Sequence, residues 1–399
     1  MEEAVSWDAP VMTIAVVMNT NQLGGAERSL VEQLKIMRET RGGAFRFFIP
    51  DLGTKSNVLT DFLSSQGFSE IQRYSYPLWL YQFSRKDFYR APVLLLLLPL
   101  LPYLLFKWRL SFTQSSVFYV NGNKAFIPVF CSCLLRRRAV VYWHFRDFPA
   151  PRAFSWIKKI LDLLKPRQLR IELIANSHAV ARELHRYLPG FPVRTIYNLA
   201  GTVDVSKVPG PVRRIGIASM FAPWKGQHDV LWMISSYRRE IRALGIEKFT
   251  FFGDSIYQTR GGHRSYREQL QLLATKLGIL DLVEFVGGKS PSQIFSAIDV
   301  LLHCSIEPEP FGRVIIEAFK ARVPVISTGL GGAAELVQHQ QTALIYQPFD
   351  LPGLFGSLEQ IASDPKMRER IIRAAAEKSD QIEAAIIDQL KDWRIEASV

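Results

Sequence analysis

Two glutamates, Glu309 and Glu317, stand on either side of a Phe-Gly pair in the stretch EPEPFGRVIIEAFK, residues 307–320. An apolar run before this stretch predicts a buried strand, and the run after the pair predicts a helix. Glu309 therefore falls in the loop and Glu317 in the first helical turns. A helix rises about 1.5 Å per residue, which places the carboxylates a nucleoside apart rather than in contact. They suit hydroxyl groups at opposite ends of one ligand, with the amides of Phe311 and Gly312 facing phosphates between them. The alternative is a helix-capping acid beside a surface acid.

Gly24 and Gly25 form a second candidate, at the entrance of a predicted amphipathic helix. Glycine lets backbone amides approach an anion, and a helix N-terminus favours negative charge. The spacing is not that of G-x-G-x-x-G, so an ordinary strand-to-helix turn is the alternative.

The stretch YWHFRDFP places His144 and Arg146 at the carboxyl end of a predicted strand, where a ligand cleft is expected. A histidine there can orient a substrate hydroxyl group, and an arginine can pair with a phosphate. The alternative is a histidine that packs beside Trp143.

Lys225 and Gly226 lie in a loop just before another predicted helix. A lysine in this position can neutralise a diphosphate with help from the helix amides, and the alternative is an exposed loop lysine. The nearby Gly288-Lys289-Ser290 is not a P-loop, because Val283 stands where that motif needs glycine. The histidines and cysteines show no metal-ligand spacing, and no D-x-D pair follows a strand, so no metal site is predicted.

Short β-branched and aromatic runs alternate with helical patterns along the whole chain, which is typical of parallel sheets covered by helices. The sequence predicts an α/β protein of two doubly wound Rossmann-like domains facing across a cleft. The first domain is predicted at residues 1–205 and the second at 206–380. A C-terminal helix at 381–399 is expected to pack back on the first domain, and a linker without clear periodicity lies near residues 200–212.

The 399 residues carry 49 Lys and Arg against 37 Asp and Glu, a formal net charge of +12. This balance favours a polyanionic partner such as an anionic membrane surface or a phosphorylated ligand. Nucleic acid is not expected, because no recognised module or stripe of alternating aromatic and basic residues is present. Three cysteines do not make a disulfide framework, no signal peptide is visible, and a cytoplasmic location is predicted.

The run APVLLLLLPLLPYLLF, residues 91–106, is apolar and contains three prolines. It is short for a spanning helix, which needs about 20 residues. A buried core helix is one alternative, and insertion into one leaflet of a membrane is the other. The basic and aromatic residues around the run favour peripheral attachment at the inner face of the membrane. The predicted membrane contacts are Leu94, Leu95, Leu97, Leu98, Lys107, Trp108 and Arg109.

These stretches together resemble glycosyltransferase family 4, a family of retaining enzymes with the GT-B fold. The resemblance runs from about residue 12 to 380 and rests on GGAE, YWHFRD, IANSHAV, VRTIYN, WKGQ, FFGD, VEFVG, E-x7-E and GLGGAAELV in this order. It implies a UDP- or GDP-linked sugar as donor, no metal and no other cofactor. It also implies an acceptor-binding first domain and a donor-binding second domain.

The resemblance gives roles to single residues. Glu317 would bind the ribose hydroxyls, Glu309 the hydroxyls of the donor sugar, and Lys225 the diphosphate, while His144 would orient the sugar. The expected catalytic residues are His144, Glu309 and Lys225. The other expected donor-binding residues are Gly24, Gly25, Arg146, Gly226, Gly253, Asp254, Val286, Lys289, Phe311, Gly312, Arg313 and Glu317.

One departure from the family pattern concerns the diphosphate. The family usually has a Gly-Arg pair where this sequence has Ser219-Met220, so one cation is missing from its usual place. Either Arg313, Arg146 or Lys289 compensates for the missing cation, or turnover of the donor is weak. The sequence thus predicts retaining transfer of a hexosyl unit to a glycan or lipid-linked acceptor, in bacterial envelope polysaccharide synthesis. The alternatives are a nucleotide-sugar epimerase of the same fold and a non-catalytic, membrane-associated homologue.

Overall fold

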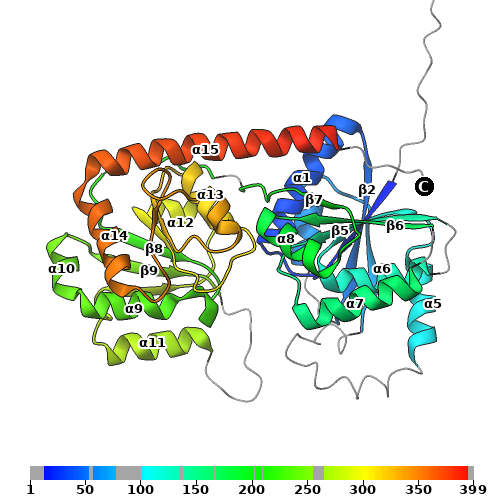
Figure 1. The fold of residues 1–399 in the computed structure, drawn as a ribbon, viewed down its shortest axis with the longest axis horizontal. Helices are drawn as coiled ribbons and strands as arrows, with labels where there is room; N and C mark the ends of the chain where they lie inside the picture. Colours follow the sequence, from blue (N-terminus) through cyan, green and yellow to red (C-terminus); the bar gives the residue numbers. More distant parts are fainter. Residues whose placement is uncertain are drawn as a thin grey trace, which may run out of the picture. The chain divides into compact units, whose positions relative to one another are not determined.

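The computed structural model of the chain describes residues 13–53, 57–77, 100–134, 138–165, 168–201, 203–208, 210–254 and 265–393. The chain forms two compact units (Figure 1). The first comprises residues 1–197 and 387–399, and the second comprises residues 198–386. The sequence placed this division after residue 205.

The first unit is built on a parallel sheet of seven strands in the order β3-β2-β1-β4-β5-β6-β7. Its central strands are buried along their whole length, as expected for a parallel sheet with helices on both faces. The strands are β1 (Thr13–Met18), β2 (Ala44–Asp51), β3 (Ile71–Ser75), β4 (Val117–Asn121), β5 (Ala139–Phe145), β6 (Leu169–Ala175) and β7 (Val193–Thr195).

Helices cover both faces of this sheet (Figure 1). They are α1 (Gly25–Arg41), α2 (Val58–Ser65), α5 (Leu101–Ser111), α6 (Asn123–Cys133), α7 (Pro151–Leu164) and α8 (His178–Tyr187). The chain passes from β1 towards β3 and then from β4 towards β7, so right-handed crossovers put α1 and α2 on one face and α5 to α8 on the other. One apolar core accordingly joins the inner residues of α5, α6, α7 and α8 to this second face.

The second unit contains a parallel sheet of six strands in the order β10-β9-β8-β11-β12-β13. The strands are β8 (Arg214–Ala218), β9 (Lys248–Phe252), β10 (Val283–Val286), β11 (Val300–His303), β12 (Val325–Ser327) and β13 (Leu344–Ile345). The helices are η3 (Pro223–Lys225), α9 (Gln227–Ser236), α10 (Arg238–Ala243), α11 (Tyr266–Lys276), α12 (Pro291–Ala297), α13 (Arg313–Lys320), η4 (Gly332–Glu335), α14 (Leu351–Ser363) and α15 (Pro365–Asp392), whose residues from 387 onward belong to the first unit. The predicted class, two doubly wound α/β units, is confirmed.

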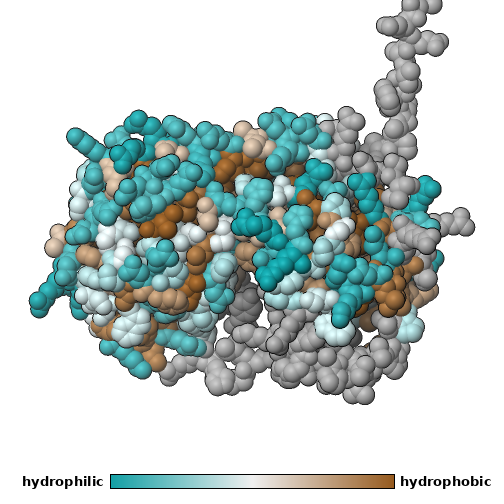
Figure 2. Space-filling model, in the orientation of Figure 1, coloured by the Kyte–Doolittle hydropathy of each residue, from teal (hydrophilic) through white to brown (hydrophobic). Residues whose placement is uncertain are grey.

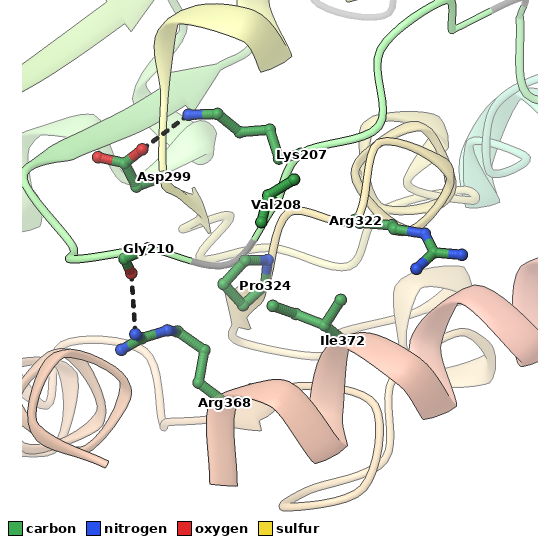
Figure 3. A pocket seen from close by; sticks show the side chains of 8 residues that line it. All are labelled: Lys207, Val208, Gly210, Asp299, Arg322, Pro324, Arg368 and Ile372. Carbon is green, nitrogen blue, oxygen red and sulfur yellow. Dashed lines mark hydrogen bonds and ion pairs between the residues drawn. The ribbon is translucent and has the colours of Figure 1, made fainter. Parts of the chain in front are cut away.

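A small pocket marks the amino-terminal edge of the second sheet (Figure 3). Lys207 Nζ donates to Asp299 Oδ1 at 2.7 Å, just before β11 begins. The guanidinium of Arg368, at the start of α15, donates to the carbonyls of Gly210 at 2.8 Å and Ile361 at 2.6 Å. These bonds fasten the segment that enters β8 to the sheet and to α15. The carboxyl ends of the strands, where ligands bind in such folds, lie at the opposite edge.

No helix within the described ranges is both long and apolar enough to cross a membrane.

Candidate functional site

Glu309 is the centre of a polar cluster at the carboxyl end of β11. Lys225 Nζ donates to both of its carboxylate oxygens, at 2.6 and 2.7 Å. His303 Nε2 lies 3.1 Å from Oε2, and Ser305 Oγ donates to the same oxygen at 2.8 Å. His303 is oriented in turn by a 3.0 Å hydrogen bond between its Nδ1 and Ser327 Oγ. Oε2 of this carboxylate therefore has three neighbouring partners, while Oε1 accepts from Lys225.

The electrostatics of Glu309 agree with this geometry. Burial by itself raises the pKa of the carboxyl group, because the charged form loses its hydration. The positive charge of Lys225 and the hydrogen bond from His303 outweigh burial, and they hold the pKa of Glu309 well below its ordinary value. Glu309 is thus a permanent anion at neutral pH and a hydrogen-bond acceptor rather than a proton donor.

The backbone around Glu309 is held by a second loop. Glu309 N donates to the carbonyl of Leu330 at 3.2 Å, and Gly332 N donates to the carbonyl of Glu309 at 2.7 Å. These bonds fix the Glu309 loop against the GLGG segment at residues 329–332, which follows β12. Two stretches that the sequence analysis grouped only by resemblance are therefore in direct contact.

Lys225 ends the short helix η3 and is only 7% exposed. Its Nζ lies 4.1 Å from the centre of the Trp224 ring. Gly226 then turns the chain into α9 with a φ of 67°, and a side chain at this position would approach the Cys304 carbonyl to 2.0 Å. Only glycine fits there, and this close approach brings Lys225 beside the end of β11. The alternative of an exposed loop lysine is wrong.

Glu317 lies in α13 and is 8% exposed. Arg313, one turn earlier, places its Nε 3.0 Å from Glu317 Oε1. Gly312 precedes the helix with a φ of 93°, a conformation that glycine adopts without strain. Phe311 beside it is buried. Glu309 thus lies in the loop between β11 and α13, Glu317 lies in α13 itself, and each is paired with a cation.

The Ser219-Met220 position is occupied by neutral groups. Gln227 Nε2 donates to Ser219 Oγ at 3.0 Å and to the Met220 carbonyl at 2.8 Å. Gly253 lies against Ser219, whose carbonyl a side chain on Gly253 would approach to 2.0 Å. Asp254 follows and accepts a 3.1 Å hydrogen bond from Gly288 N on its side chain.

Two further expected donor-binding residues of this unit, Val286 and Lys289, lie at the end of β10 and just after it. Val286 ends β10 and is partly buried, and Lys289 is exposed in the loop before α12. The carboxyl ends of β8 to β11 therefore gather most of the predicted positions in the second unit.

The first unit has a polar cluster at the carboxyl ends of its own strands. Arg146 Nε donates to Asn121 Oδ1 at 2.9 Å, and Asn176 Nδ2 donates to the Arg146 carbonyl at 3.3 Å. At the start of α1, the Glu27 carboxylate accepts a 3.0 Å hydrogen bond from Gly24 N. Burial raises the pKa of Glu27, while the charge of Arg146 opposes the shift. Gly25 begins α1 itself.

His144 lies fully buried in β5. Its Nδ1 is 2.5 Å from the hydroxyl group of Tyr119, and its Nε2 has no hydrogen-bond partner within the described part of the chain. Burial, assisted by the charge of Arg146, lowers the pKa of His144 well below its ordinary value, so the imidazole is neutral at pH 7. Neighbouring strand residues point to opposite faces, and Trp143 stacks on Phe126 in the core on the other face.

The predicted membrane contacts divide into two groups. Leu94, Leu95, Leu97 and Leu98 lie outside the described residues. Lys107 and Arg109 are exposed on α5, but Trp108 is buried and its Nε1 donates to the Ser75 carbonyl at 2.7 Å. Trp108 therefore belongs to the core of the first unit and does not face outward.

Sequence reasoning missed His303, Ser305, Asn121 and Asn176. Each ends a strand or lies at most two residues beyond one, and that position was the available signal. Within the residues that the structure describes, no group of three His, Cys, Asp or Glu side chains is arranged to hold a metal ion.

The second unit is similar to a known protein family. Residues 206–378 match the model of the family described as Glycosyl transferases group 1. The matched segment contains the whole cluster around Glu309 as well as Glu317.

Curated relatives cover parts of the chain. The lipopolysaccharide core biosynthesis glycosyltransferase LpsE of Rhizobium meliloti is 28% identical over 207 residues, which are 50% of this chain and 56% of that protein. A D-inositol 3-phosphate glycosyltransferase of Streptomyces avermitilis is 37% identical over 116 residues, 28% of this chain and 25% of that protein. The chain thus matches about half of the length of these relatives or less.

Solved structures match over nearly the full length. Anabaena HepE in complex with UDP-glucose superimposes with a TM-score of 0.73 and 22% identity, covering 95% of this chain and 98% of HepE. Sucrose-phosphate synthase from Thermosynechococcus elongatus gives a TM-score of 0.71 with 16% identity, over 95% and 97% of the two chains. These similarities establish the fold, that of the GT-B glycosyltransferases.

Proposed function

We propose that the chain is a glycosyltransferase that binds a nucleotide sugar on its second unit and transfers the sugar to a glycan or lipid-linked acceptor. The observation that carries the proposal is the cluster of Lys225, His303, Ser305 and Glu309 inside the segment that matches the group 1 glycosyl transferases. Relatives named as lipopolysaccharide core biosynthesis glycosyltransferases support an acceptor of the bacterial envelope. The ligands of the solved HepE structures, UDP-glucose in one and UDP with glucose in another, support a nucleotide sugar as donor.

The donor would meet charges that already neutralise each other. Lys225 and Glu309 form a buried ion pair, so the lysine must be shared when a diphosphate arrives. The diphosphate brings negative charge to Lys225, while sugar hydroxyls replace the ammonium protons as donors to Glu309. Glu317 would accept hydrogen bonds from the ribose. This exchange couples recognition of the sugar to recognition of the diphosphate.

We infer a retaining, metal-independent reaction, as the resemblance to family 4 implies. The acceptor oxygen forms a bond with the anomeric carbon on the face from which the nucleoside diphosphate leaves. The leaving phosphate oxygen takes the acceptor proton as the bond between that oxygen and the anomeric carbon breaks. Lys225, Arg313 and Lys289 supply positive charge for the leaving diphosphate in the second unit, and Arg146 is the candidate from the first.

His144 is proposed to orient the donor sugar. Its neutral imidazole can donate or accept a hydrogen bond without adding charge. An epimerase would need an acid/base pair, and Glu309 does not supply the acid because its pKa is held below the ordinary value. A non-catalytic homologue is favoured by one observation, the neutral groups at Ser219-Met220. We also retain the proposal that the first unit contacts an anionic membrane surface, to which Lys107 and Arg109 are available.

Purified protein incubated with UDP-, GDP- and ADP-linked sugars tests the proposal. Slow hydrolysis of one donor to free sugar and nucleoside diphosphate is the expected result. When a matching acceptor is added, the nucleoside diphosphate should be released faster and the sugar should appear on the acceptor. An epimerised donor would favour the epimerase, and failure of every nucleotide sugar to raise the melting temperature would favour the non-catalytic homologue.

A further inference from the structure

Helix α7 carries apolar side chains on two sides. Its inner face places Phe154, Ile157 and Leu161 against the core of the first unit. Its outer face carries a second stripe, Trp156, Ile160, Leu163 and Leu164, at the spacing i, i+4, i+7 and i+8. Trp156 is 57% exposed and Leu163 81% exposed. A helix at the surface of a water-soluble domain needs only the inner stripe, so the outer one calls for a partner.

Helix α5 repeats this arrangement. Leu104 and Trp108 face the core, whereas Tyr103, Phe106 and Leu110 are more than half exposed on its outer side. Both helices cover the same face of the sheet, with α6 between them in the order of the crossovers, so both outer stripes face away from the sheet in the same direction. Figure 2 shows hydrophobic side chains at the surface where Figure 1 draws α5 and α6.

The exposed apolar residues of the first unit are concentrated here. Of ten large exposed apolar side chains among its described residues, only Val58 lies away from this layer. The others are Leu100, Tyr103, Phe106, Leu110, Ile127, Trp156, Ile160, Leu163 and Leu164. We call the outer stripes of α5 and α7, with Leu100 and Ile127, the α5–α7 surface. If exposed apolar side chains were scattered at random, the helices of the opposite face would carry several of them rather than Val58 alone among their described residues.

Charge identifies the kind of partner. Lys107 and Arg109 on α5, and Lys159 and Lys165 at the side and end of α7, surround the apolar stripes. Asp162 is the one acidic residue in the two helices, and Lys158 holds it in an ion pair at 2.6 Å. Lys159 Nζ lies 5.0 Å from the centre of the Trp156 ring, so a cation and an aromatic ring are presented together. Apolar stripes edged with aromatic and basic groups are typical of helices that lie in a membrane interface.

We propose that the α5–α7 surface attaches the first unit to a bilayer that contains anionic lipid, with the outer stripe of α7 as a main contact. The apolar side chains enter the boundary between headgroups and acyl chains, and the lysines and arginine contact lipid phosphates. The contact does not depend on the proposed chemistry, since vesicle binding needs neither donor nor acceptor.

Co-sedimentation with vesicles of phosphatidylcholine, with and without an equal part of phosphatidylglycerol, tests the proposal. The test variant is Trp156→Ser with Leu163→Ser, and the matched control is Trp232→Ser with Leu280→Ser, which removes equivalent exposed side chains from the second unit. The test variant is expected to lower the partition coefficient for anionic vesicles at least about tenfold, and the control to leave it unchanged. Both variants should melt at the wild-type temperature, because all four side chains are substantially exposed.

Two further measurements separate the possible partners. Lys107→Glu with Lys159→Glu should weaken binding to anionic vesicles and reduce its sensitivity to salt. Brominated acyl chains should quench part of the tryptophan fluorescence, and Trp156→Phe should abolish that part while preserving binding. Equal sedimentation of the test variant and the control would overturn the proposal. So would a wild-type dimer that the test variant converts to monomer with no effect on vesicle binding, since the surface would then join two copies of the chain.

Discussion

Lys225→Met removes the charge that neutralises Glu309 while keeping the length and the apolar part of the side chain. The Lys225 and Glu309 side chains are 8% and 14% exposed, so water cannot replace the lost ammonium group. Breaking a buried pair in this way costs about 3–5 kcal/mol of unfolding free energy. Because His303 and Ser305 remain as donors to Glu309, the expected loss of unfolding free energy is at the lower end of this range, about 3 kcal/mol.

A double variant separates the cost of the unpaired Glu309 charge from the cost of losing the Lys225 side chain. Lys225→Met with Glu309→Gln removes both ions, and the neutral amide can still accept from Ser305, so the expected loss is smaller, about 1 kcal/mol. Arg213→Met is the matched control. It breaks an ion pair with Glu247 in the same unit, in which both side chains are more than half exposed, and should cost at most about 1 kcal/mol.

Urea unfolding followed by circular dichroism measures these differences, and hydrogen exchange in β11 assigns the loss to the second unit. Two outcomes would refute the reasoning. One is an equal loss for Lys225→Met and Arg213→Met, and the other is a double variant that is less stable than Lys225→Met alone.

Three shorter predictions concern pH, catalysis and metals. In the folded protein the pKa of Glu309 lies below its ordinary value of 4.5, so its ionisation stabilises the fold fully above about pH 4.5 and less as the pH falls further. The difference in unfolding free energy between the wild type and Glu309→Gln should therefore be constant from pH 5 to 8 and become smaller in acid. A gap that changes between pH 6 and 8 would contradict the assignment. His144→Ala should lower transfer at least about tenfold with little change in nucleoside diphosphate affinity, and equal losses in both would exclude the proposed role. Transfer should persist in excess EDTA; loss of activity that Mg²⁺ or Mn²⁺ restores would show that a metal is required.

The strand pattern predicted most of the fold because parallel strands are continuous apolar runs. The apolar run TIAVVM forms β1, AVVYWH forms most of β5, and KFTFF forms β9. The residues IQRYS, which form β3, are mostly polar because β3 lies at the edge of the sheet and is half solvated, so no apolar run predicts this strand. The two-residue strand β13 is too short for any periodicity.

Site residues could be predicted where the residues that act together lie close in the sequence. The pattern around Glu309 and Glu317 predicted that Glu309 lies in the loop after a strand and Glu317 in the helix that follows, as in the structure. The Lys225–Glu309 ion pair joins residues 84 apart in the sequence, and only the folded sheet brings them together. His303 falls within the apolar run that predicts a buried strand before the Glu309 loop. Its role is visible only in the structure, where the loop places the Glu309 carboxylate against its ring.

Trp108 shows that amino-acid composition alone does not predict which residues of a helix face outward. The sequence FKWR has basic and aromatic residues typical of a membrane interface, yet helical spacing puts Trp108 one turn after Leu104, on the face that packs against the core. The same periodicity leaves Lys107 and Arg109 outside. The outer stripe on α7 could not be separated in the sequence, because the apolar residues of the inner and outer faces together form one hydrophobic pattern.

Calorimetric titration of the nucleoside diphosphate and of the matching nucleotide sugar tests the assignment of the donor site most directly. Glu317→Ala should weaken both ligands alike by about 1.5–3 kcal/mol, because both carry the ribose. Glu309→Gln should weaken only the nucleotide sugar and leave the affinity for the diphosphate unchanged or raised, since Lys225 no longer has a competing carboxylate. Glu307→Ala, an exposed acid in the same loop, is the control for both. If both variants bound both ligands as the wild type does, or if Glu309→Gln weakened the two ligands equally, the donor would not bind as described.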